Sequence, residues 1–373
     1  MTDGRFSAPS GRIPSLDGFR GVGMCAVLLT HLTGTAGFPA RLQFLDAIGS
    51  LGVRTFFILS GFLITTLLLK ESSDRGGVDL KAFYIRRMLR LLPAFAIYVT
   101  FVAIAGALGW CKLFPGDLSH ALTYTMNYQA PQAWSLGHLW SLSVEEQFYV
   151  LWPATFLLLG VARSVPLLCS VILLCPLVRV LLLLNTRQEH WLVVQHFEAN
   201  ADALAIGCLL ACQAEKLIRN EWYRSVIRSK YFVVVPLAAI AVNQYTAHHQ
   251  GIDGAFGQSV KNVLMALTVH HATIVPSASI GRLLNTTAFT QIGVMSYSIY
   301  LWQQFFINRH EVSAYTTFPV SVLLAVAAGY CSYRLVERPI AKLRYRSRDS
   351  RRPDTQPAAH PADLTPYRRP DPA

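Results

Sequence analysis

Charged side chains are scarce in this sequence. Asp, Glu, Lys and Arg make up 14% of the 373 residues, where a soluble domain carries about 25%. Hydrophobic residues make up 53%, and the mean hydropathy is +0.36. A net charge of +12 points to nucleic acid only in a chain that stays in water. We therefore expect a membrane protein without a nucleic-acid partner.

Several short motifs of enzymes and metal sites are also missing. The sequence contains no P-loop, no G-x-G-x-x-G fingerprint and no G-x-S-x-G elbow. Its seven cysteines form no C-x-x-C pair, and most lie in apolar runs. Cys208 and Cys212 share a helix face, but no histidine or carboxylate accompanies them there. We predict neither a disulfide framework nor a metal site.

What the chain has instead is long apolar runs. Because they are continuously apolar and do not alternate with period two, they indicate helices, not a transmembrane barrel. A helix of about 20 residues crosses the hydrocarbon of a bilayer. Six runs of that length lack Asp, Glu, Lys and Arg: 21–40, 91–111, 231–252, 262–281, 283–308 and 312–333. Shorter or interrupted candidates are 51–70, 139–161, 164–184 and 199–214. The sequence predicts an all-α, polytopic integral membrane protein of about ten transmembrane helices.

Basic residues orient these helices. With a cytoplasmic N-terminus, the outer segments hold little beyond Arg41, Lys112, Arg187 and Arg309, and the inner segments hold the rest. This distribution satisfies the positive-inside rule with both termini cytoplasmic. We expect a short N-terminus (1–15), a membrane domain (16–340) and a basic, Pro-rich, disordered cytoplasmic tail (341–373) that can touch lipid headgroups. We expect no cleaved signal and no appended soluble domain.

Ionisable residues inside apolar runs are costly, so they mark candidate sites. Arg20 and His31 are eleven residues apart in the first run, which places them on one helix face about 16 Å apart along the axis. Histidine suits general-base work, and arginine suits phosphate or carboxylate binding. The structural alternative is an interfacial arginine and a histidine bonded to a backbone carbonyl.

Two further groups carry charge. The segment 136–153 contains Glu145 and Glu146, of which one at most is expected to face a partner helix; a catalytic carboxylate and a structural ion pair are equally compatible with it. The other group is Glu198 and Asp202, which are spaced to share a helix face. They could bind a hydroxylated ligand or cap their helix.

The segment 83–93 places Arg86, Arg87 and Arg90 just before an apolar run. These arginines could anchor the helix on the cytoplasmic side, or could cradle the phosphates of a nucleotide-containing cofactor.

Six segments in order carry a family resemblance: LDGFRGVGMCAVLLTH (16–31), GVRTFFILSGFLIT (52–65), FYIRRMLRLLP (83–93), LWSLSVEEQFYVLWP (139–153), MSYSIYLW (295–302) and VERP (336–339). The chain resembles the membrane-bound acyltransferase-3 family over residues 16–340. The resemblance implies an inner-membrane O-acyltransferase that moves an acyl group, often acetyl, from cytoplasmic acetyl-CoA or another acyl-CoA to a hydroxyl of a cell-surface carbohydrate or glycolipid.

The resemblance also assigns roles to residues. It implies that His31, Arg20 and Glu145 are catalytic, with Glu145 orienting His31 or the acceptor. Arg86, Arg87 and Arg90 would hold the donor phosphates. For the acceptor we expect Asp17, Ser60, Glu146, Glu198 and Asp202.

The sequence departs from the family pattern at Arg54, where many members carry an acidic residue, and at Gln303, where many carry histidine. The acceptor stays open among lipopolysaccharide, exopolysaccharide, peptidoglycan, a glycolipid and a small secreted metabolite. A transporter or exporter of a lipid-linked glycan or anionic metabolite is the alternative function, although it predicts internal repeats that the sequence does not show.

Overall fold

The computed structural model describes residues 13–185 and 190–342. Every regular element in these ranges is helical. The predicted tail falls outside them except for residues 341 and 342, as does the predicted N-terminus except for residues 13–15.

The helices follow one another along the chain with short connections. The α-helices are α1 (Pro14–Leu32), α2 (Ile48–Arg75), α3 (Leu80–Ala107), α4 (Asp117–Leu122), α5 (Trp134–Gly137), α6 (Leu139–Asn185), α7 (His190–Val193), α8 (Phe197–Arg219), α9 (Glu221–Ile227), α10 (Val234–Ala247), α11 (Gln250–Ile252), α12 (Gln258–Ile274), α13 (Ser279–Leu284), α14 (Thr287–Phe306) and α15 (Val320–Ser332). Short 3₁₀ or π segments are η1 (Ala40–Ala47), η2 (Met126–Tyr128), η3 (Asp253–Gly257) and η4 (Tyr333–Glu337).

Four helical segments are long and apolar enough to cross a membrane: Ala40–Arg75, Leu80–Ala107, Trp134–Asn185 and Val320–Lys342. Their length and composition support the expected all-helical membrane protein. The ten-span topology and the cytoplasmic termini stay predictions.

The longest helix, α6, contains a break that the sequence places almost correctly. At Gly160 the backbone adopts φ 64° and ψ 177°, outside the helical region. A residue with a side chain is strained at a positive φ, whereas glycine is not. The break separates two apolar arms close to the boundary expected between residues 161 and 164.

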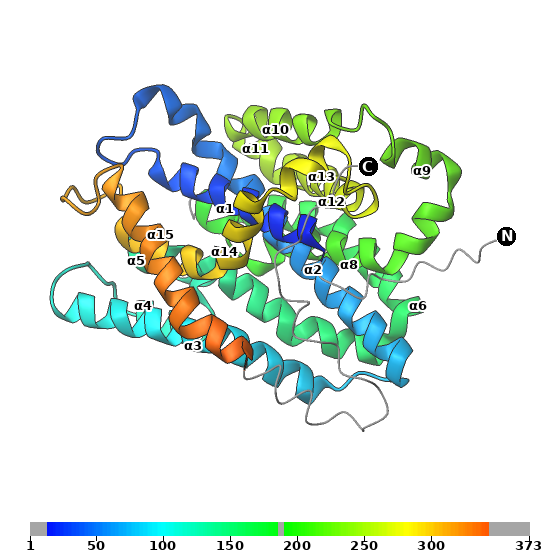
Figure 1. Cartoon of the computed structure of the whole chain (residues 1–373), viewed down its shortest axis with the longest axis horizontal. Helices are drawn as coiled ribbons and strands as arrows, with labels where there is room; N and C mark the ends of the chain where they lie inside the picture. The colour runs from blue at the N-terminus through cyan, green and yellow to red at the C-terminus, as the bar shows by residue number, and fades with distance from the viewer. Residues whose placement is uncertain (1–12, 186–189, 343–373) are drawn as a thin grey trace, which may run out of the picture.

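Helices α1, α2, α8 and α14 form the centre of the molecule (Figure 1). Helix α1 packs against α2 and α14, and α2 packs against α8. Gly61 on α2 lies against the backbone of Leu204, and Gly207 on α8 lies against the backbone of Ile58, so that a Cβ at either glycine would collide with the facing helix. Small residues of this kind let membrane helices approach closely.

Candidate active site

His31 lies near the end of α1, half-buried, with both ring nitrogens against α14. Nδ1 is 3.1 Å from Oε1 of Gln303, and Nε2 is 3.1 Å from Nε2 of Gln304. An amide oxygen can only accept, so Nδ1–H donates to Gln303 in this arrangement. The amide N–H of Gln304 donates to Nε2, so in this arrangement the imidazole is neutral and its Nε2 lone pair is the basic site.

Gln304 is itself fixed by His138. The backbone N–H of His138 donates to Oε1 of Gln304 at 3.0 Å, and the ring Nδ1 of His138 is also 3.0 Å from that oxygen. Because Oε1 faces this N–H, the amide nitrogen of Gln304 is left to face His31. A chain of polar contacts therefore runs from His138, between α5 and α6, through α14 to α1.

His31 lines a large cavity of about 1480 Å³. The rim includes residues from 110–114, 130–135 and 308–311, segments that the charge distribution places on the outer side. Trp134 packs edge-on to the ring of His31 with the centroids 5.7 Å apart, and the guanidinium of Arg309 lies 5.1 Å over Trp134. A concave site that combines aromatic walls with many polar and charged side chains can bind a ligand that is partly apolar and partly hydroxylated.

Arg20 lies on the same helix as His31, as predicted, but not beside it. Its Nη1 is 3.1 Å from Oδ1 of Asp17. The eleven-residue spacing within α1 separates Arg20 from His31 by about 16 Å along the axis, and Arg20 does not line the cavity that contains His31. The two residues therefore cannot act on the same atom of a ligand.

The predicted arginines of α3 divide into two groups. Arg90 interacts electrostatically with both Arg20 and Arg87, so these three form one basic cluster. Arg87 is partly buried and forms an ion pair with Glu146 at 3.2 Å. Arg86 is exposed and instead pairs with Glu71 at 3.3 Å, near the end of α2.

Glu145 forms its hydrogen bond with α2. The hydroxyl of Ser60 donates to Oε1 of Glu145 at 2.9 Å, which brings together two residues predicted to belong to the site. Glu145 also interacts electrostatically with Arg20 and Arg87. Within 13–185 and 190–342 no hydrogen bond joins Glu145 to His31, so the orientation of the imidazole is set by Gln303 and Gln304.

Glu198 and Asp202 lie on one helix face, as predicted, but their carboxylates have different partners. Glu198 accepts a hydrogen bond from the hydroxyl of Tyr128 at 2.8 Å. Burial and the Glu198 carboxylate raise the pKa of Tyr128 to about 12, so this hydroxyl keeps its proton. Asp202 pairs with Arg179 at 3.0 Å, and both side chains are fully buried. The geometry of Asp202 supports a structural role.

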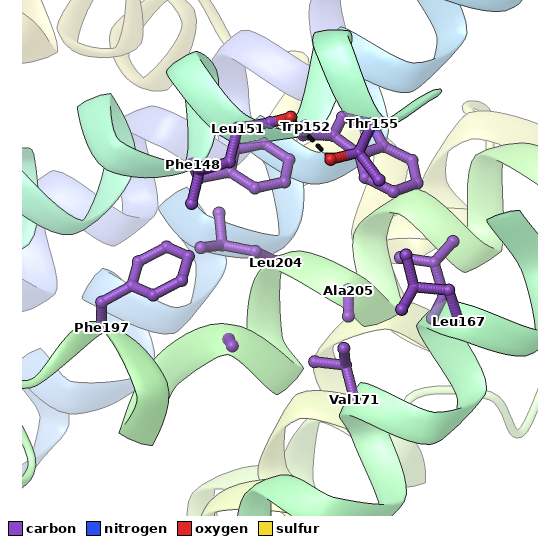
Figure 2. A pocket seen from close by; sticks show the side chains of 11 residues that line it. Phe148, Leu151, Trp152, Thr155, Leu167, Val171, Phe197, Leu204 and Ala205 are labelled. Carbon is purple, nitrogen blue, oxygen red and sulfur yellow. Dashed lines mark hydrogen bonds between the residues drawn. The ribbon is translucent and has the colours of Figure 1, made fainter. Parts of the chain in front are cut away.

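A second, smaller pocket of about 150 Å³ lies between the two arms of α6 and α8 (Figure 2). Its walls are apolar, with Phe148, Trp152 and Leu204 among them. The hydroxyl of Thr155 is turned back onto the carbonyl of Leu151 at 2.9 Å. None of the predicted site residues lines this pocket, and we assign no chemistry to it.

Sequence reasoning did not find Gln304, Trp134 or Arg309. An amide, an indole and an outer-segment arginine carry no signal by themselves, because their roles arise from packing between distant segments. Among the residues that the structure describes, no three His, Cys, Asp or Glu side chains gather closely enough to hold a metal ion.

Comparisons with known proteins agree on one family. The model of the acyltransferase domain of the acyltransferase-3 family matches residues 13–332. The chain is 29% identical over 363 residues to a Staphylococcus aureus protein named "Putative O-acetyltransferase", covering 88% of this chain and 57% of that protein. It is 27% identical over 370 residues to the peptidoglycan O-acetyltransferase OatA of Listeria monocytogenes, covering 88% and 56%.

The chain thus spans little more than half the length of these relatives. No solved structure matches it. The match of the family model covers most of the chain, and this chain belongs to the acyltransferase-3 family.

Proposed function

We propose that this protein is a multi-pass enzyme of the bacterial inner membrane that moves an acetyl group from cytoplasmic acetyl-CoA to a hydroxyl of a cell-surface glycan. The observation that carries the proposal is the position of His31. Its neutral imidazole lines a large outer cavity and is held by two glutamines. The family match and the O-acetyltransferase relatives support the reaction type.

His31 serves as the general base in this proposal. The acceptor hydroxyl replaces the amide N–H of Gln304 at Nε2 of His31. Nε2 then takes the proton of the hydroxyl, and the hydroxyl oxygen attacks the carbonyl carbon of the thioester. The C–S bond breaks, the thiolate leaves, and the imidazolium returns the proton to the sulfur. The products are a glycan ester and coenzyme A. A positioned base of this kind contributes about 10²–10⁴-fold in rate.

The basic cluster of Arg20, Arg87 and Arg90 binds the donor phosphates. Guanidinium groups bind phosphate oxygens in a bidentate way, and Arg90 interacts electrostatically with both Arg20 and Arg87. Arg20 is about 16 Å from His31 along α1, so it acts on the donor phosphates and not on the reacting carbonyl. The acyl-carrying arm of acetyl-CoA has to span this distance to reach His31. In this proposal it extends past the hydrogen-bonded pair of Ser60 and Glu145.

The outer cavity binds the acceptor in this proposal, and Trp134 offers a flat apolar surface to a sugar ring beside His31. Peptidoglycan is the first acceptor to test, because one relative is named a peptidoglycan O-acetyltransferase. Glu146 holds Arg87 of the basic cluster, and the hydrogen-bonded pair of Ser60 and Glu145 positions the donor arm in this proposal.

Reconstitution tests this function. The full chain is placed in liposomes with [¹⁴C]acetyl-CoA on one side and soluble peptidoglycan strands on the other. We expect thioester consumption and label in the strands, with no label when donor and strands share the outer side. A folded chain that never consumes acetyl-CoA or longer acyl-CoAs would contradict the proposal and favour a transporter. Consumption without labelled strands would point to another surface glycan.

A further inference from the structure

The outer cavity contains a second charged region besides His31. Arg54 on α2, Asp253 in η3 and Lys261 on α12 all line it. Helix α2 comes from a distant part of the chain, η3 leads directly into α12, and α10 packs against all three. The side chain of Arg54 is 6% exposed, so its charge is almost completely removed from water.

The carboxylates of this region are already engaged by other cations. Nζ of Lys261 is 2.6 Å from Oδ1 of Asp253. Nη1 of Arg179 is 3.0 Å from Oδ2 of Asp202. Two carboxylates and three cations therefore share the region, and Arg54 is the cation that is left over.

Arg54 has only a neutral partner. Its Nη1 donates to Oδ1 of Asn262 at 3.0 Å, and no carboxylate of the described residues lies within ion-pair distance. Its Nε is buried and has no hydrogen-bond partner among these residues. Asp202 and Asp253 interact with Arg54 electrostatically but are paired with other cations. A buried cation without an ion-paired carboxylate of its own costs free energy, and so a protein normally pairs it or uses it.

We propose that Arg54 binds an anionic group, a carboxylate or a phosphate, on the acceptor glycan. The proposal rests on the function proposed above, in which this cavity holds the acceptor. The edge of a guanidinium that carries Nε matches two oxygens of a carboxylate or phosphate, which explains an arginine at this position better than a lysine would. An anionic acceptor supplies the missing counter-charge and is thereby fixed relative to His31.

Simple anions test the subsite without any glycan. The melting temperature of the purified full chain is measured in chloride, acetate and phosphate at equal ionic strength, with saturating coenzyme A present to occupy any phosphate site for the donor. Arg54→Gln is compared with Arg163→Gln, which removes the same charge from an exposed position in α6.

We expect acetate or phosphate to raise the melting temperature of the native chain and of Arg163→Gln by about 2 °C or more, and to leave Arg54→Gln unchanged. In chloride, Arg54→Gln should melt no lower than the native chain, because it loses an unpaired buried charge. An equal anion response in all three proteins would overturn the subsite. So would a lower melting temperature of Arg54→Gln together with an unchanged anion response, since that pattern belongs to a structural arginine.

Acyl transfer then distinguishes the two anions. The acceptors are peptidoglycan strands freed of peptides and bearing lactyl carboxylates, the same strands with these groups converted to amides, and amidated strands phosphorylated on a sugar. We expect the KM of the native chain for one anionic form to be about tenfold lower than for the neutral form. Arg54→Gln should lose this preference, and Arg54→Lys should keep part of it.

The two experiments fail separately. If the anion response depends on Arg54 but no strand is acetylated, the subsite stands and peptidoglycan is the wrong acceptor. If anionic and neutral strands are acetylated equally by the native chain and by Arg54→Gln, the proposed function stands and the subsite is wrong.

Discussion

Nδ1 of His31 lies 3.1 Å from Oε1 of Gln303, and this contact joins the first helix of the molecule to α14. It fixes which nitrogen of the imidazole carries the proton, and it leaves Nε2 as the base. The two residues are 272 positions apart. The orientation of the proposed catalytic base is therefore a property of tertiary packing.

Gln303→Leu removes the acceptor of the Nδ1–H bond. We expect kcat to fall about tenfold, the value of one lost hydrogen bond at a reacting group, with the KM for acetyl-CoA unchanged. Gln303→Glu keeps an acceptor oxygen in place and should recover most of the rate. Steady-state kinetics of both variants check this. A rise in KM without a change in kcat would instead assign Gln303 to donor binding.

Arg87 and Arg86 offer a matched pair. Arg87→Gln removes a member of the basic cluster, so the KM for acetyl-CoA should rise about tenfold or more and the salt dependence of binding should weaken. Arg86→Gln removes an exposed arginine that pairs with Glu71 and should change KM less than about threefold. Initial rates over a range of acetyl-CoA and salt concentrations separate them. Equal effects would mean that the two arginines bind the donor together.

Asp202 is the counter-ion of a fully buried arginine. Asp202→Asn leaves Arg179 without its carboxylate, and we expect a loss of about 3–5 kcal/mol of stability, seen as a lower melting temperature. Glu198→Gln changes the neighbouring carboxylate, which is partly exposed, and should cost less than about 1 kcal/mol. Activity per folded molecule should survive in both. If Asp202→Asn is as stable as the native chain but has a higher KM for the acceptor, Asp202 binds substrate, as the sequence predicted.

Gly61 allows α2 to touch α8. Gly61→Ala would place a Cβ against the backbone carbonyl of Leu204, and the helices can relieve the collision only by separating. We expect little folded protein, measured as the monodisperse fraction after size-exclusion chromatography in detergent. Gly77→Ala is the control, because nothing lies within 4 Å of the added Cβ. A fully folded Gly61→Ala would show that this contact is adaptable.

Local patterns in the sequence predicted a large part of the fold. The apolar runs indicated helices because membrane helices need about 20 apolar residues. They also anticipated the break in α6 at Gly160 to within a few residues. The spacing of Arg20 and His31 placed both on one helix, because that distance depends only on helix geometry. Such features depend on neighbours in the chain.

The partners of the site residues were not predictable in this way. Ser60 meets Glu145 and Gln303 meets His31 only after helices from distant parts of the chain have packed. The family resemblance implied that Glu145 orients His31 or the acceptor. The structure describes no contact between Glu145 and His31, and the amides that do touch His31 gave no signal of their own.

The most direct test of the account is donor and acceptor turnover by His31→Ala. Three proteins are compared: the native chain, His31→Ala, and the control His249→Ala at an exposed histidine. They are purified in detergent, shown to have the same melting temperature, and assayed with radiolabelled acetyl-CoA and peptidoglycan strands. The account predicts that His31→Ala loses about 10²-fold or more of label transfer while still binding acetyl-CoA, and that His249→Ala retains native activity. Native turnover by His31→Ala would leave an acyltransferase without this base and would contradict the site described here.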